Sequence, residues 1–209
     1  MATDSKVGGA GLLRRYSNVA VSLHWLIVAL LLVQIWLGFV FGDMPKGPER
    51  MAFFSWHKTV GAAILVLTLV RLGYRLLNPP PAYPAEMPAW RRAAALWSHR
   101  LFYFLLIGLP LTGLIAVSGH TKGWFTPLIG GIPLPVVPGI GAATGELSGS
   151  VHEVLVWTMI ALLVLHVAAA LYEQFLARCS VSYRMPPLQP KHGQDVVIGQ
   201  GGRGLPAEG

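Results

Sequence analysis

Four long apolar runs divide this chain, separated by short segments rich in Pro, Gly and charged residues. The runs cover about residues 20–41, 57–77, 96–117 and 151–175. As helices they would rise ~1.5 Å per residue, so about 20 residues are enough to cross a hydrocarbon layer of ~30 Å. The pattern predicts an all-α integral membrane four-helix bundle. We expect one membrane domain over residues 16–178, with flexible tails at 1–15 and 179–209.

Composition and charge support this prediction and suggest an orientation. Hydrophobic residues make up 54% of the chain and charged residues only 12%, whereas an average soluble domain carries roughly 25% charged residues. If the N-terminus is cytoplasmic, 12 of the 16 Lys and Arg residues fall on the cytoplasmic side and four on the other. This asymmetry matches the positive-inside rule. Both termini are therefore predicted to be cytoplasmic in a multi-pass protein, and the positive charge needs no nucleic-acid partner.

Histidines are the chemically informative residues of the apolar runs. Five of the seven lie inside the runs or at their ends: His24, His57, His99, His152 and His166. Ionisable residues at membrane depth are costly and usually functional. Because the helices alternate in direction, His57 and His152 are predicted to form an outer layer and the other three an inner layer. His120 and His192 are interpreted as surface residues.

The spacing on the fourth run is the sharpest signal. His152 and His166 are 14 residues apart, which places them within about 40° of one helix face and ~21 Å apart along the axis. Each could supply a ligand to a separate haem, since neutral imidazole is a common axial ligand. The single cysteine and the absence of a C-x-x-C-H motif exclude covalent c-type haem. Two b-type haems are therefore predicted.

The outer pair follows directly as His57 with His152, while the inner pair has two solutions. His166 pairs with His24 or with His99; we favour His24, which lies deeper in its helix, and leave His99 to bind a propionate or a quinone. Arg71 lies 14 residues after His57 and is a candidate partner of a haem propionate. A zinc or copper site made by the three inner histidines is an alternative, but it leaves the outer pair unexplained.

At these residues the chain resembles the bacterial di-haem cytochrome b561 family over about residues 14–178. The matching pieces, in order, are Arg15-Tyr16-Ser17, Ser22-Leu23-His24-Trp25, Trp56-His57-Lys58, Val70-Arg71-Leu72 with Arg75, Ser98-His99, Leu109-Pro110-Leu111-Thr112-Gly113, Trp124-Phe125, Val151-His152-Glu153 and Leu165-His166-Val167-Ala168. Together and in this order the pieces are specific to the family, although no single piece is.

The resemblance implies an oxidoreductase of the bacterial inner membrane, surrounded by membrane lipid. Similar family members oxidise superoxide at the periplasmic face and pass its electron through two haems to ubiquinone. Carried over, His57 and His152 hold the outer haem, while His24 and His166 hold the inner one. The family's basic funnel for the anion would use Lys58 and Lys122, helped by Lys46 and Arg50. This sequence departs from that pattern because four acidic residues lie on the same side, namely Asp43, Glu49, Glu146 and Glu153.

Two other functions fit parts of the sequence. The first is the haem-carrying membrane subunit of a hydrogenase or another periplasmic dehydrogenase, which would receive electrons from a periplasmic redox protein docked on the apolar outer loop. The second is a haem-free membrane protein, which would need another explanation for five histidines at membrane depth.

Overall fold

The computed structural model describes residues 16–80, 83 and 87–175. Within these residues it contains four long helices, α1 (Asn18–Asp43), α2 (Pro48–Leu77), α3 (Ala89–Ser118) and α4 (Ala142–Phe175). All four are long and apolar enough to cross a membrane, which confirms the predicted all-α membrane bundle. The predicted tails at 1–15 and 179–209 lie outside the described residues.

The helices extend beyond the predicted runs, most of all at two N-terminal ends. α2 and α4 each begin nine residues earlier than predicted, at Pro48 and Ala142, and α3 begins seven residues earlier, at Ala89. Apolar patterning marks only the part of a helix that lies in hydrocarbon, so a polar helical extension above the membrane gives no such signal. Pro48 is well suited to the first turn of α2, where its missing N–H has no helical partner.

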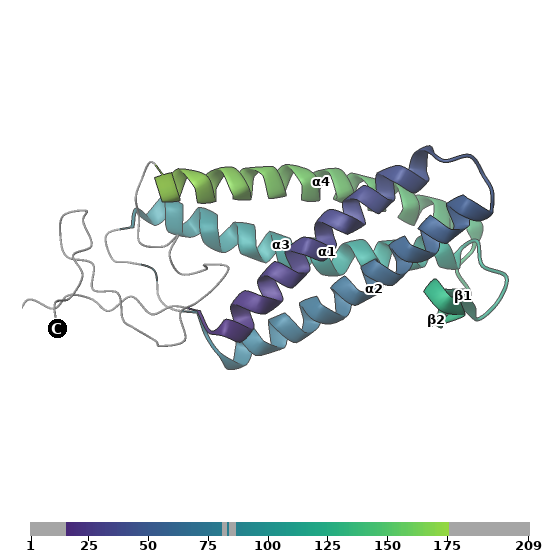
Figure 1. Cartoon of the computed structure of the whole chain (residues 1–209), viewed down its shortest axis with the longest axis horizontal. Coiled ribbons are helices and arrows are strands. Elements are labelled where there is room, and N and C mark those ends of the chain that lie inside the picture. Colours follow the sequence, from purple (N-terminus) through teal and green to yellow (C-terminus); the bar gives the residue numbers. More distant parts are fainter. Residues whose placement is uncertain (1–15, 81–82, 84–86, 176–209) are drawn as a thin grey trace, which may run out of the picture.

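The bundle is built from two helix pairs. α1 packs along α2 and α3 packs along α4, while α2 and α3 provide contact between the pairs (Figure 1). Many large apolar side chains on the outer surfaces remain exposed, as expected for a lipid-facing surface. The tight contact within the second pair depends on two glycines near the outer end of the bundle. A Cβ on Gly119 would lie 2.6 Å from the Gly145 Cα, so only glycine allows the backbones to approach this closely.

An apolar layer occupies the middle of the bundle. Leu31, Leu105 and Met159 form one cluster that joins α1, α3 and α4, and Leu105 and Met159 are almost fully buried. Ile64 of α2 belongs to a neighbouring cluster and contacts Leu106 of α3 in the same region. Met159 is seven residues from both His152 and His166. The apolar layer therefore separates two levels of histidines.

The apolar segment between α3 and α4 folds into a small cap at the end of the bundle where α2 and α4 begin, the end predicted to be the outer one. Its strands β1 (Phe125–Pro127) and β2 (Pro133–Pro135) pair antiparallel, with Thr126 opposite Leu134. A one-turn 3-10 helix, η1 (Ile129–Gly131), joins them and requires glycine because φ is +68° at Gly130 and +76° at Gly131. Figure 1 shows the cap beside the N-terminal half of α2.

Candidate haem site

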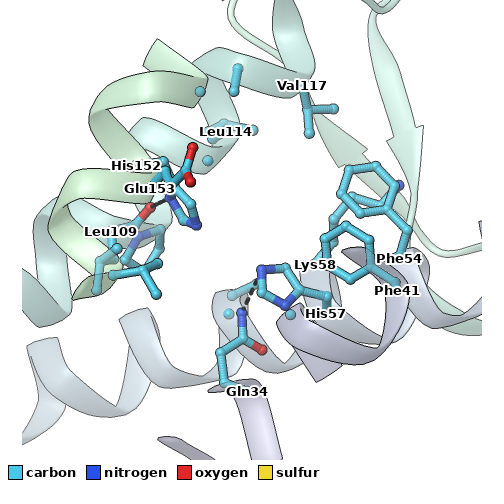
Figure 2. A pocket seen from close by; sticks show the side chains of 18 of the residues that line it. Gln34, Phe41, Phe54, His57, Lys58, Leu109, Leu114, Val117, His152 and Glu153 are labelled. Atoms are coloured by element: carbon cyan, nitrogen blue, oxygen red, sulfur yellow. Dashed lines mark hydrogen bonds between the residues drawn. The ribbon is translucent and has the colours of Figure 1, made fainter. Parts of the chain in front are cut away.

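The structure brings His57 and His152 together, as the sequence predicts. Their ring centroids are 6.3 Å apart, although they come from α2 and α4, which belong to different helix pairs. Figure 2 shows the two imidazoles pointing toward one another across a cavity. Since bonds between imidazole nitrogens and first-row metals are about 2 Å long, this separation suits two rings that bind one metal ion from opposite sides.

The cavity between these rings has the size and character of a cofactor pocket. Its volume is about 820 Å³, within the range of roughly 300–1,000 Å³ found for small-molecule and cofactor sites. Its walls are mainly apolar side chains of all four helices, and the cap contributes Thr126, Pro127 and Leu134. A largely apolar pocket with two opposed imidazoles fits a porphyrin with an axial histidine on each face.

Hydrogen bonding prepares His152 to act as a ligand. Its Nδ1 lies 2.9 Å from the Leu109 carbonyl oxygen, and a carbonyl can only accept a hydrogen bond, so Nδ1 carries the hydrogen. The lone pair then resides on Nε2, which Figure 2 shows on the side that faces His57. The Thr112 hydroxyl lies 3.2 Å from the same Nδ1. Partners of this kind orient ligating histidines and select their tautomer.

Two glycines allow the histidines to occupy these positions. A Cβ on Gly38 of α1 would lie 3.4 Å from His57 Cε1, and one on Gly113 of α3 would lie 3.3 Å from His152 Cε1. In each helix pair, therefore, one helix supplies the histidine and its neighbour supplies the glycine behind it. Gly38 and Gly113 lie 14 residues after His24 and His99 in their own helices. In the structure they make room for the rings of His57 and His152.

Gln34 is a cavity residue that the sequence analysis missed. Its side-chain amide nitrogen donates to His57 Nε2 at 3.1 Å, which indicates that the lone pair of this imidazole also lies on Nε2. A Cβ on Gly61 would be 3.1 Å from that amide nitrogen, so the glutamine lies against a glycine gap in α2. The sequence feature that could have indicated Gln34 is a single side-chain amide in the middle of a predicted membrane helix.

The outer opening of the cavity carries fewer charges than the predicted funnel. Lys58 lines the cavity and donates to Thr126 of β1 at 2.7 Å. Glu146 and Glu153 line it too. Lys122 is exposed and is not among the described residues that line this cavity. His120, interpreted as a plain surface residue, is also a lining residue.

The three inner histidines lie at the opposite level. His166 is in ring contact with two residues of α3, His99 at 5.8 Å and Phe102 at 5.1 Å. His24 of α1 lies within electrostatic range of His166, His99 and Arg71. Arg71 donates to the Ala20 carbonyl at 2.6 Å. Among the described residues no group of three His, Cys, Asp or Glu side chains is arranged to hold a metal ion, so the zinc or copper alternative has no support.

Comparisons with known proteins agree with this site. The sequence profile of prokaryotic cytochrome b561 matches residues 15–187. The chain is 26% identical to cytochrome b561 homolog 2 of Escherichia coli K12 over 183 residues, which cover 82% of this chain and 90% of that protein. It is 25% identical to a probable superoxide oxidase CybB of Yersinia pestis over 179 residues, which cover 83% and 97%. A cytochrome b562 of Cereibacter sphaeroides is 31% identical over 114 residues, which cover 50% and 67%.

The match extends through all four helices and includes all five histidines at membrane depth. The facing imidazoles, the apolar cavity between them and the glycines behind them suit an axially ligated haem. The chain therefore belongs to the prokaryotic cytochrome b561 family and is a bacterial multi-pass membrane protein that carries b-type haem in electron transport.

Proposed function

We propose that this cytochrome oxidises superoxide at its outer face and reduces ubiquinone in the membrane. Two superoxide anions would each give up one electron and leave as dioxygen. The two electrons, together with two protons, would convert one ubiquinone to ubiquinol. Two bound b haems would supply the one-electron carriers between these half-reactions. The relationship to a probable superoxide oxidase of Yersinia pestis supports this choice of donor.

The single observation that carries the proposal is the opposed His57–His152 pair, 6.3 Å apart across the capped cavity. His57 and His152 would together hold a bound haem iron, and a haem held by two imidazoles would supply electron transfer rather than oxygen binding. Leu109 and Thr112 hold His152 in its ligating tautomer. These fixed partners would limit reorganisation when the charge at the site changes.

Lys58 is the proposed steering residue for the anion. It follows His57 directly, lines the cavity and places its ammonium group against Thr126 of the cap. A cation at the opening of a low-dielectric cavity raises the local concentration of small anions. Because Glu146 and Glu153 line the same cavity, the attraction depends on the position of Lys58 beside His57 and not on net charge. Lys122, which does not line the cavity, would add to this attraction only from a distance.

For the inner haem we propose His24 and His166 as ligands. The outer ligands come from different helix pairs, and His24 with His166 repeats that arrangement. His99 and His166 instead belong to the closely packed α3–α4 pair, where Phe102 already contacts His166. This leaves His99 free for another ligand. Arg71, which lies within electrostatic range of His24, is proposed to pair with a propionate.

Two consequences of this proposal concern the movement of protons through the bundle and the orientation of the protein in the membrane. The apolar layer around Leu105 and Met159 contains no described titratable side chain and would pass electrons but not protons. The proposal also places the cap on the periplasmic side of the inner membrane and both termini in the cytoplasm. Arg71, Arg75, Arg91, Arg92 and Arg100 all lie at the end of the bundle opposite the cap, as the positive-inside rule requires.

One observation favours a second candidate, the membrane subunit of a periplasmic dehydrogenase. The cap and its approach expose Trp124 at 71%, Phe125 at 56% and Ile132 at 58%. Exposed apolar side chains at the outer end suit the docking of a protein donor. In that case the same haems would be used without superoxide chemistry. The haem-free alternative is wrong, because the family is one of haem proteins.

Rapid mixing separates the two candidates. The detergent-purified protein, oxidised and with no partner, is mixed with a superoxide pulse, and haem reduction is followed by absorbance. Reduction that is much faster than in a soluble bis-histidine cytochrome, and that continues to ubiquinol when ubiquinone is added, supports superoxide oxidation. Haem reduction no faster than in that control would contradict superoxide oxidation and favour the membrane subunit that receives electrons from a protein donor.

A further inference from the structure

A set of hydrogen-bond donors faces the inner half of the α2–α3 interface, and we call it the inner donor cluster. It consists of Thr68, Arg71 and Arg75 on α2 and His99 and Tyr103 on α3. The α2 members are spaced i, i+3 and i+7 and the α3 members i and i+4, so each set shares one helix face. The Arg75 guanidinium lies 5.9 Å from the centre of the Tyr103 ring, and both arginines act electrostatically on His99.

Two members of this cluster are buried without a hydrogen-bond partner among the described residues. These atoms are Thr68 Oγ1 and Tyr103 Oη. Thr68 is fully buried, with 0% of its surface exposed. A buried polar group destabilises the protein when it stays unsatisfied.

Other helical threonines in this protein show that the case of Thr68 is unusual. Thr59, Thr112 and Thr158 each donate to the carbonyl oxygen four residues earlier, at 2.7 to 2.9 Å. This is the ordinary solution for a threonine inside a helix. Thr68 lacks it. Its hydroxyl is therefore left without an acceptor in its own helix.

The cluster contains two cations and no anionic side chain. In the described part of the chain the one ion pair joins Arg91 to Glu173, away from this cluster. Arg71 uses one N–H on the Ala20 carbonyl, which leaves the rest of its guanidinium available. Both arginines are half-buried, and a guanidinium removed from bulk water binds best to an anion or a strong acceptor. A partner that brings oxygen acceptors would satisfy the arginines and the buried hydroxyls together.

Depth argues against a lipid phosphate as that partner. Thr68 lies nine residues before the end of α2 at Leu77, or about 14 Å along the helix axis. A phosphate headgroup stays at the membrane surface, whereas Thr68 is level with the hydrocarbon. An apolar ligand that carries its own oxygens can reach this depth.

We propose that the inner donor cluster binds the acceptor oxygens of an apolar ligand, supplied either by a propionate of the inner haem or by a carbonyl of a ubiquinone head group. The inference rests on the proposed function and assigns roles to Thr68, Arg75 and Tyr103. Tyr103 and Thr68 donate through their hydroxyls, and the arginines neutralise charge on the acceptor. All five are binding or positioning residues.

The test uses haem-loaded protein in detergent, with Tyr103→Phe, Thr68→Val and Arg75→Gln compared with the matched controls Tyr74→Phe and Thr158→Val. The Tyr74 hydroxyl already bonds to Ser17, and Thr158 is satisfied within α4. Three quantities are measured: the midpoint potentials of both haems, haem per chain, and the ubiquinone concentration that gives half-maximal oxidation of haem reduced beforehand with dithionite. Because dithionite replaces superoxide, this result does not depend on the outer reaction.

Each outcome decides one point. If one haem shifts in midpoint potential or is lost while the ubiquinone dependence is unchanged, the acceptor is a propionate. If both potentials are unchanged and the half-maximal ubiquinone concentration rises about tenfold, as expected for the loss of one hydrogen bond to a ligand, the acceptor is the quinone. If Tyr103→Phe and Arg75→Gln match the controls in all three measurements, the proposal is overturned.

Discussion

The Nδ1 of His152 on α4 donates a hydrogen bond to the main-chain carbonyl of Leu109 on α3, 2.9 Å away. Leu109 immediately precedes Pro110, which lies inside α3. Pro110 cannot donate to the carbonyl four residues before it, which is that of Leu106, and its ring disturbs the local helix. Thr112 also lies within reach, donating to the carbonyls of Gly108 and Leu109. This part of α3 therefore both accepts from His152 and fixes the ring nitrogen that is presented to the cavity.

Substitution of single histidines tests the two ligand layers. We expect His57→Ala and His152→Ala to remove the same haem, and His24→Ala to remove the other, because each deletion takes away one of two axial ligands. His99→Ala should retain both haems. The measurement is haem per polypeptide, together with reduced-minus-oxidised spectra. Loss of the inner haem in His99→Ala, with retention in His24→Ala, would show that His99 and His166 are the inner pair.

Gly113→Ala tests the space behind His152. The new Cβ would lie 3.3 Å from His152 Cε1, so the ring must shift by a few tenths of an ångström. We expect weaker retention of the outer haem and a stability loss of about 1–3 kcal/mol, as for other overpacked sites. Haem content after dilution and thermal unfolding measure these effects. Gly73→Ala is the control, since no heavy atom lies within 4 Å of its added Cβ, and an equal effect in both would refute the explanation.

Gly119→Ala tests the crossing of α3 and α4. Its Cβ would be 2.6 Å from the Gly145 Cα, and backbone cannot move aside as a side chain can. The helices must separate, and we expect a loss of about 1–3 kcal/mol or more, with a lower midpoint of thermal unfolding. Gly42→Ala, which meets no atom within 4 Å, should be unchanged. A Gly119→Ala protein as stable as the Gly42→Ala protein would mean that the crossing is looser than described.

Lys58→Gln tests steering of the anion. Removal of this cation should slow haem reduction by superoxide about tenfold at low ionic strength, and the difference should shrink as salt is added. Thr126→Val removes the hydrogen bond to the cap while it retains the charge, so it separates the two roles of the lysine. A difference between Lys58→Gln and the unaltered protein that stays constant as salt is added, or an equal loss in Thr126→Val, would indicate that Lys58 acts by holding the cap.

Much of the fold and of the outer site follows from sequence patterns that have a direct physical cause. A hydrocarbon layer requires long apolar helices, so the four runs predicted the bundle. Alternating helix direction then assigned His57 and His152 to one level, and the structure places their rings 6.3 Å apart. Gly38 and Gly113 share a spacing of 14 residues from His24 and His99. These features depend on period and depth, which a sequence carries by itself.

Other features arise only when helices meet. The partner of His152 is a backbone carbonyl, which every residue possesses, so no sequence signal could select Leu109. Gln34 and Lys58 gained their contacts from what α2 and the cap place opposite them, whereas Lys122 is exposed and does not line the cavity in the described part of the chain. The sequence by itself determined which residues lie in the membrane and at what depth, because solvent acts on each residue separately. The tertiary structure decided which side chains face one another, because that depends on the packing angle and rotation of helices that are distant in the chain.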